Sequence, residues 1–116
     1  MARTILIVDD HAGFRASARR VLEAAGYEVM ADAVDGDSGV AAAVDVGPDV
    51  VLLDVQLPDI DGFEVARRLE LAGVSSLIVL TSSRDRSDFG SLIEASGVRG
   101  FVPKAELSAE SLAAVL

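Results

Sequence analysis

Short runs of apolar, largely β-branched residues alternate with Ala- and Leu-rich segments along the whole chain. The run at 4–8 is apolar at nearly every position, and so is the run at 50–54 up to its last residue. Strands show such continuous apolar runs when helices cover both faces of their sheet. Between the runs, Phe14, Ala18 and Leu22 recur at the spacing of one helix face. The alternation therefore predicts a parallel sheet with right-handed helical crossovers.

We predict the fold class α/β, with a five-stranded parallel sheet of order 2-1-3-4-5 and helices on both faces, the flavodoxin-like doubly wound arrangement. Gly26 supplies a helix stop, Asp35 begins a capping segment, and Ser108 is a plausible cap for the last helix. Gly90 weakens the fourth helix. The expected strands lie at 4–8, 27–33, 50–54, 76–80 and 98–102, and the expected helices at 12–25, from 35–38 to about 47, 63–72, 87–96 and 105–116.

Charge and composition argue against several classes of function. The chain has 10 Lys and Arg against 19 Asp and Glu, a net charge of -9, so we expect no direct binding to nucleic acid. With no Cys it has no disulfide and no thiolate chemistry. No apolar run approaches a membrane span, and the first residues do not resemble a signal peptide. We expect a cytoplasmic protein in which residues 1–116 form one domain, with a last helix that looks cut short.

Four of the predicted strands end at polar residues. Asp9 and Asp10 follow the first strand, Asp54 closes the third, Thr81 follows the fourth and Lys104 follows the fifth. Open parallel sheets bind ligands at the edge formed by the carboxyl ends of the strands, where strand order reverses. With the order 2-1-3-4-5 this point lies between strands one and three, so we expect the three aspartates to meet there.

Three neighbouring carboxylates need a partner to stay charged. Two like charges about 4 Å apart repel by roughly 4 kcal/mol at an effective dielectric near 20. A raised proton affinity relieves this repulsion, and so does a divalent cation. Carboxylate ligands plus waters suit Mg²⁺ better than a full Ca²⁺ cage. The alternative, that each aspartate only caps a turn, stays open for any one of them alone.

Lys104 and Thr81 add a cation and a hydroxyl donor to this edge. Lys104 is the only lysine among ten Lys and Arg residues, and an ammonium on a flexible stem reaches a carboxylate or phosphoryl oxygen as a point charge. The Thr81 hydroxyl can donate to an oxyanion, although Ser82 leaves the register uncertain by one residue. Together with the aspartates, these groups fit phosphoryl transfer to the Asp54 carboxylate.

Four sequence pieces occur here in a characteristic order: Ile7 to His11, Leu52 to Pro58 with Asp61 and Gly62, Val79 to Ser82, and Gly100 to Lys104. Each piece alone is weak, but together they make the chain similar to the receiver domain of two-component response regulators over essentially its full length. The pieces most resemble receivers that precede a helix-turn-helix DNA-binding domain.

The resemblance implies a phosphoacceptor switch that is not otherwise an enzyme. Asp54 would accept a phosphoryl group from a histidine kinase or phosphotransfer protein and pass the change to the face formed by the fourth helix, fifth strand and fifth helix. Partners would include a C-terminal output domain or a separate protein, and the phosphorylated form could be a homodimer. The residues that the resemblance implies for Mg²⁺ are Asp9, Asp10, Asp54 and the Gln56 backbone carbonyl. Those that it implies for the phosphoryl group and the switch are Thr81, Lys104, Phe101 and Ser82.

Three features depart from the usual pattern of the family. Receivers often have a small residue where this chain has Ser82, and many have a Pro after the Lys, whereas here Pro103 precedes Lys104. Phe101 lacks the hydroxyl of the alternative Tyr, so any signal through it would be steric.

Other polar groups receive structural interpretations. We interpret His11 as a loop or cap residue rather than a phosphate carrier or metal ligand, and the Arg15, Arg19 and Arg20 cluster as a solvated helix face. The aromatic residues Phe14, Tyr27, Phe63 and Phe89 are expected to pack in the core or between helices.

Three rival functions remain to be weighed. A haloacid-dehalogenase-like phosphatase has an Asp two residues after its nucleophile, but here His11 and Gln56 stand at those positions. A flavodoxin needs a hydroxyl-rich phosphate loop, which the chain lacks after its first strand. The third rival, a receiver-like interaction module that signals without phosphorylation, stays open.

Overall fold

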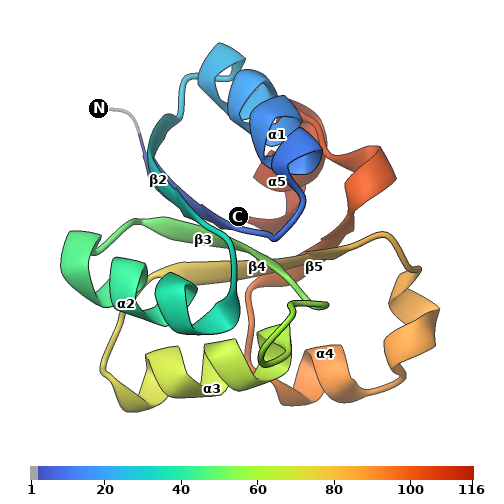
Figure 1. Ribbon diagram of the computed structural model, residues 1–116. Coiled ribbons are helices and arrows are strands. Elements are labelled where there is room, and N and C mark those ends of the chain that lie inside the picture. Colours follow the sequence, from blue (N-terminus) through green and yellow to red (C-terminus); the bar gives the residue numbers. More distant parts are fainter. Residues whose placement is uncertain (1–2) are drawn as a thin grey trace.

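The structure is a computed structural model that describes residues 3–116. Its centre is a five-stranded parallel sheet of order β2-β1-β3-β4-β5, as the sequence predicts (Figure 1). β3 is buried at every residue and β1 at all but its first, because helices cover both faces of the sheet. The strands are β1 (Thr4–Val8), β2 (Glu28–Ala33), β3 (Val50–Asp54), β4 (Leu77–Ser82) and β5 (Gly100–Pro103).

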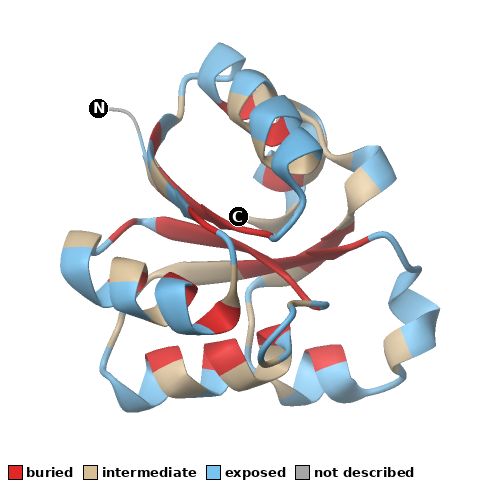
Figure 2. Cartoon of the chain, in the orientation of Figure 1, coloured by how far each residue is buried: buried red, intermediate tan, exposed pale blue. Residues whose placement is uncertain are grey.

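The helices form a layer on each face of the sheet, which gives the doubly wound, flavodoxin-like arrangement (Figure 1). On one face, Leu22 and Leu112 pack in a cluster with Leu52. On the other face, Val65 and Leu69 belong to a second cluster that also contains Ile93 and Phe101. Helix surfaces toward the sheet are buried and those away from it are exposed (Figure 2). One layer holds α1 (Ala12–Ala24) and α5 (Ala109–Val115), and the other holds α2 (Gly36–Val46), α3 (Gly62–Leu71) and α4 (Leu92–Ala95).

The prediction of one continuous helix over 87–96 is wrong. The segment is divided into a 3₁₀ turn at Arg86–Phe89 and the single-turn helix α4, with Gly90 between them. Gly90 has φ +56 and ψ -126, a backbone conformation that interrupts an α-helix and that glycine adopts without strain. The apolar residues of this segment therefore lie on a 3₁₀ turn and a short α-helix rather than on one helix.

The last helix and the fourth strand also differ from their predicted bounds. A 3₁₀ turn occupies Lys104–Glu106, and α5 begins only after Ser108, whose hydroxyl accepts a 3.0 Å hydrogen bond from the Ser111 amide. Ser108 is thus the predicted cap, but it moves the helix start beyond residue 105. β4 extends to Ser82, so Thr81 lies inside the strand instead of after it.

Within residues 3–116, no helix has the length and apolar character needed to cross a bilayer.

Candidate functional site

The three aspartates meet at the carboxyl edge of the sheet, as predicted. β1 and β3 are adjacent, with Val8 paired to Leu53, so the residues that follow them lie side by side. Side-chain ligand atoms of Asp9, Asp10, His11 and Asp54 all lie within 4.8 Å of one another. Asp9 and Asp54 are buried, with 1% and 2% of their side chains exposed, whereas Asp10 is partly open to solvent.

Lys104 reaches the same point from the end of β5. Its Nζ lies 2.7 Å from Asp9 Oδ2 and 3.1 Å from Asp54 Oδ2. The ammonium also sits over the Phe14 ring, 4.6 Å from the ring centroid, where a cation–π contact stabilises it. This geometry explains a lysine here, because a compact charge on a flexible stem fits between two carboxylates where a planar guanidinium would not.

Burial and charge act in opposite directions on these groups. Burial raises the pKa of Asp54, and repulsion from Asp9 adds to the rise. The hydrogen bond from the Gln56 amide, 3.1 Å from Asp54 Oδ1, and the charge of Lys104 lower this pKa, but the net shift is upward. Burial lowers the pKa of Lys104, but its contacts with Asp9 and Asp54 outweigh that effect and the pKa ends above its usual value. Lys104 therefore stays protonated and offsets part of the charge of the buried acids.

Thr81 and Ser82 use their hydroxyls differently. Thr81 pairs with Asp54 in the sheet register, and its buried Oγ1 has no hydrogen-bond partner among residues 3–116. A buried hydroxyl without a partner costs about 1–3 kcal/mol and commonly marks a functional position. Ser82 Oγ is also buried, but it accepts a 3.0 Å hydrogen bond from the Arg84 amide and so stabilises the turn after β4.

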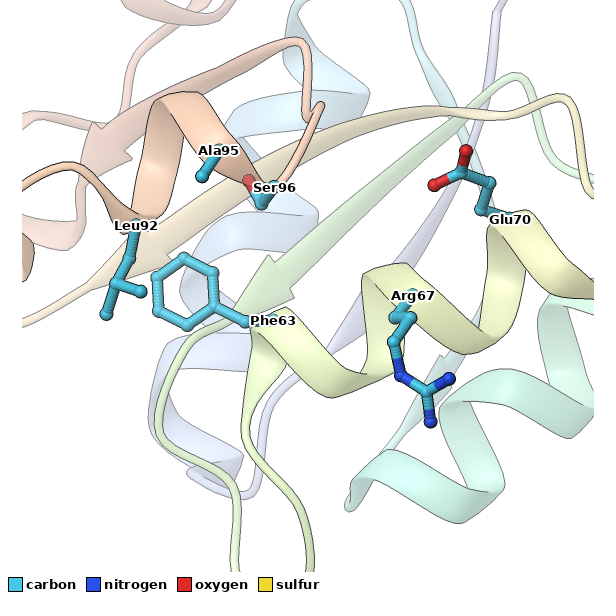
Figure 3. Close-up of a pocket in the computed structure, with 6 residues that line it drawn as sticks. All are labelled: Phe63, Arg67, Glu70, Leu92, Ala95 and Ser96. Atoms are coloured by element: carbon cyan, nitrogen blue, oxygen red, sulfur yellow. The ribbon is translucent and has the colours of Figure 1, made fainter.

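Phe101 is buried and joins a row of three aromatic rings. Its centroid lies 5.8 Å from that of Phe89, which lies 5.9 Å from that of Phe63 in an edge-to-face arrangement. Phe63 in turn lines a cavity of about 270 Å³ between α3 and α4, together with Leu92 and Ser96 (Figure 3). The expected packing role of Phe63 and Phe89 is confirmed, and Phe14 and Tyr27 pack against the opposite face of the sheet.

The structure corrects the interpretation of Arg15 as part of a solvated face. Its side chain is 17% exposed, its Nη1 donates a 2.8 Å hydrogen bond to the Asp9 carbonyl, and its Nε lies 3.5 Å from Asp32 Oδ2. Arg15 thus ties α1 to the ends of β1 and β2, while Arg20 is exposed as expected. Since the partner carbonyl belongs to the backbone, the residue pattern carries no signal for this contact.

Gly62 is a second residue on which the site depends. A Cβ at this position would lie 2.6 Å from the Asp54 carbonyl oxygen and 2.9 Å from Val55 Cα. The Gly62 amide donates a 2.8 Å hydrogen bond to the Val55 carbonyl. The absent side chain therefore lets α3 start against the segment that carries Asp54.

The donor atoms at this edge suit a hard divalent cation. Carboxylate oxygens are the ligands that such ions prefer. Asp9 Oδ2 is fully buried and accepts no hydrogen bond of good geometry from residues 3–116. The Lys104 ammonium, 2.7 Å away, compensates its charge. The Gln56 side chain is exposed, and its backbone amide donates a hydrogen bond to Asp54.

His11 lies at the cap position before α1, as predicted, but its side chain makes no capping hydrogen bond. Its Nδ1 lies 3.2 Å from both Asp9 Oδ1 and Asp10 Oδ1.

Known proteins resemble this chain in sequence. BvgA of Bordetella pertussis, named as a positive transcription regulator of virulence factors, is 34% identical over 106 residues, which cover 91% of this chain and 51% of BvgA. The chain thus spans about half the length of the curated relatives it matches.

Solved structures show the same fold. A two-component response regulator of the LuxR family from Aurantimonas sp. SI85-9A1 has a TM-score of 0.89 and 29% identity, covering 99% of this chain and 83% of that one. The chemotaxis response regulator CheY4 of Vibrio cholerae has a TM-score of 0.87 and 27% identity over the whole of both chains. The family model of the response regulator receiver domain matches residues 5–116. The chain therefore belongs to the response regulator receiver domain family.

Proposed function

We propose that Asp54 is the phosphoacceptor of a signalling switch, and that a histidine kinase or phosphotransfer protein supplies the phosphoryl group. The observation that carries this proposal is a buried carboxylate 3.1 Å from the ammonium of the only lysine in the chain, at the edge where Asp9 and Asp10 converge. Membership in the receiver family supports it.

The proposed step transfers one phosphoryl group between two proteins. A carboxylate oxygen of Asp54 attacks the phosphorus of a phosphohistidine, a P–O bond forms, and the P–N bond breaks with its electron pair on the departing imidazole. Lys104 moves from a carboxylate partner to an equatorial phosphoryl oxygen. The Thr81 hydroxyl, which has no hydrogen-bond partner in the described part of the chain, donates to another such oxygen.

Asp9, Asp10, Asp54 and the Gln56 carbonyl would hold Mg²⁺ at this site. When bound, the ion neutralises charge on the transferring phosphoryl group. Asp9, Asp10 and Asp54 supply carboxylate oxygens at one point of the sheet edge, so the residues of this chain fit that ion.

Thr81 and Phe101 would relay the change to the α4-β5-α5 face. Thr81 Oγ1 gains a partner when the phosphoryl group arrives, which biases the end of β4 and the loop that follows. Phe101 is packed on Phe89, so any response it makes is steric. Phosphorylation can shift the equilibrium between an inactive and an active conformation only by its differential interaction with the two. The two conformations must therefore already be close in free energy. We assign Ser82 a local structural role and no direct phosphoryl contact.

The output would belong to a C-terminal domain or a partner protein. BvgA is a transcription regulator about twice as long as the matched region, so DNA binding by an attached domain is the output we propose, with homodimerisation on phosphorylation as its trigger. We propose that the chain turns over no external substrate and catalyses only its own phosphorylation and dephosphorylation. A cytoplasmic location and a single domain over residues 1–116 stay predictions.

An NMR titration with beryllofluoride and Mg²⁺ tests this proposal. We expect amide shifts at Thr81, Lys104 and the 86–95 segment that require both components and vanish in Asp54→Asn. The exposed Asp59→Asn variant is the matched control and should respond like the wild type. If shifts are absent or identical in Asp54→Asn, the chain is instead an interaction module that signals without phosphorylation.

A further inference from the structure

His11 stands in the position of a helix cap but does not act as one. Its backbone is extended at the start of α1, and its side chain makes no capping hydrogen bond. Ser, Thr, Asp and Asn are the residues that normally fill this position, because their short side chains reach the helix amides. The imidazole is directed to the acids instead, so its role lies at the carboxyl edge of the sheet.

The spacing of the imidazole and the acids matches that of ligands around one ion. Nδ1 lies 3.2 Å from Asp9 Oδ1 and 3.2 Å from Asp10 Oδ1. Adjacent ligands on an octahedral ion with bonds of about 2.1 Å lie about 3.0 Å apart. The Asp54 carboxylate is within 4.8 Å of the same group, so one ion could contact all four side chains.

Lys104 does not compete for this position. Its contacts are to the Oδ2 atoms of Asp9 and Asp54, whereas His11 faces the Oδ1 atoms of Asp9 and Asp10. Carboxylate oxygens only accept hydrogen bonds, so the 3.2 Å contact of Nδ1 with Asp9 Oδ1 is a hydrogen bond that Nδ1 donates. To bind an ion, the ring must adopt the other neutral tautomer, with the proton on the outward nitrogen and the lone pair on Nδ1; the 67% exposed ring can make this change in water.

A nitrogen ligand changes which ions a carboxylate site prefers. Imidazole binds Co²⁺, Ni²⁺ and Zn²⁺ well, whereas Mg²⁺ favours oxygen and keeps several waters. We propose that His11 Nδ1 is an additional side-chain ligand at this site, which therefore binds late first-row divalent ions more tightly than its acids alone would. This inference rests on the cation site of the proposed function and adds a residue and an ion class to it.

Equilibrium binding of Ni²⁺ and Mg²⁺ to the tag-free chain tests the inference. His11 is the only histidine and there is no cysteine, so no other side chain supplies a nitrogen or sulfur ligand of this strength. His11→Asn is the matched variant, since Asn is a good cap and places an amide donor near the position of Nδ1. We expect its Ni²⁺ affinity to fall at least about tenfold and its Mg²⁺ affinity to stay within about threefold.

Two results would overturn the ligand role. Equal Ni²⁺ affinity in wild type and His11→Asn means that the imidazole is not a ligand. An equal loss for Ni²⁺ and Mg²⁺, seen also in His11→Ala, means that His11 only positions the acids. Undiminished Ni²⁺ binding in Asp10→Asn would likewise place the ion elsewhere.

A spectroscopic measurement adds a direct signature. With Co²⁺ bound, the proton spectrum should show strongly shifted, non-exchangeable imidazole C–H signals, which are lost in His11→Asn; their absence from the wild type overturns the inference. Phosphodonor labelling with Mg²⁺ separates this outcome from the proposed function. If the wild type is labelled on Asp54 but shows no Co²⁺-shifted imidazole, the proposed function stands and the ligand role of His11 is refuted. If the imidazole signals are shifted but Asp54 is not labelled, the ligand role stands and the proposed function is refuted.

Discussion

Lys104 links two buried carboxylates that come from different strands. Asp9 and Asp54 are almost completely buried, and both lie within about one hydrogen-bond length of the same ammonium. Desolvating two acids is costly, and one lysine offsets that cost for both. Removing it leaves two like charges next to each other with no nearby compensation.

Lys104→Met should therefore lower the free energy of unfolding by about 3 kcal/mol in the absence of divalent ions, because it leaves the buried carboxylates without a counter-charge. Urea unfolding at neutral pH measures the change. Arg20→Met removes the same charge from an exposed position of α1 and should stay within about 0.5 kcal/mol of wild type. Comparable stability of the two variants would show that Lys104 does not compensate the acids.

Gly62 makes a second prediction at the scale of single residues. Gly62→Ala places a Cβ against the Asp54 backbone, so either α3 or the end of β3 must move. We expect a loss of about 1–3 kcal/mol and weaker Mg²⁺ binding. Gly13→Ala is the control, because a Cβ there meets no atom within 4 Å and should be neutral or mildly stabilising. A Gly62→Ala variant that keeps both properties would show that the close approach is not needed.

At the scale of elements, the central strands and their helices are the most predictable part of the molecule. β1 and β3 are apolar at all but one terminal residue each because they are covered on both faces, so composition alone indicates their position in the sheet. The polar ends of these strands also locate Asp9 and Asp54, since parallel strands share one carboxyl edge.

Gly90 gives a partial signal in the sequence: a glycine inside the 87–96 segment indicates a weakened helix, and its positive φ in fact divides the segment. Two other features depend on contacts that local patterns do not encode. Arg15 binds a backbone carbonyl. Asp59 accepts hydrogen bonds at 2.7 and 2.9 Å from the Gly36 and Asp37 amides, and so caps α2 from the distant β3–α3 loop. Each of these depends on tertiary structure rather than on residue type.

The divided 86–95 segment should be the least stable of the helical elements. A 3₁₀ turn and a helix of one turn have few internal hydrogen bonds, and isolated short helices are marginal in water. We expect amide hydrogen exchange to be fastest here and to slow when beryllofluoride and Mg²⁺ bind. Protection equal to that of α1 in the free chain would contradict this assignment.

At the scale of the whole molecule, the two carboxyl groups with the most strongly lowered pKa, Asp59 and Glu64, make the free energy of unfolding depend on pH in acid. Hydrogen bonds from the Gly36 and Asp37 amides lower the pKa of Asp59 from 3.8 to about 2, and contacts with Arg67 and Arg68 lower the pKa of Glu64 from 4.5 to about 2. A lowered carboxyl pKa stabilises the folded chain above the unfolded value and is lost as pH falls toward the folded value. Both contributions should therefore disappear between about pH 4.5 and pH 2.

Urea midpoints measured across that range check this prediction. Asp59→Asn and Glu64→Gln should each flatten the pH dependence below pH 4.5, and the double variant should flatten it further. Because Asp59 is exposed and Glu64 is about 30% exposed, each effect should be modest and should shrink in high salt. An unchanged slope in the double variant would mean that other acids dominate.

The switch as a whole depends on Asp54 accepting a phosphoryl group, and site-resolved mass spectrometry after incubation with Mg²⁺ and a small phosphodonor tests this most directly. We predict one phosphoryl group per chain, located on Asp54, dependent on Mg²⁺, absent from Asp54→Asn and retained in Asp59→Asn. Labelling of Asp54→Asn to the wild-type level, or no labelling of a folded wild type that binds Mg²⁺, would contradict the assignment.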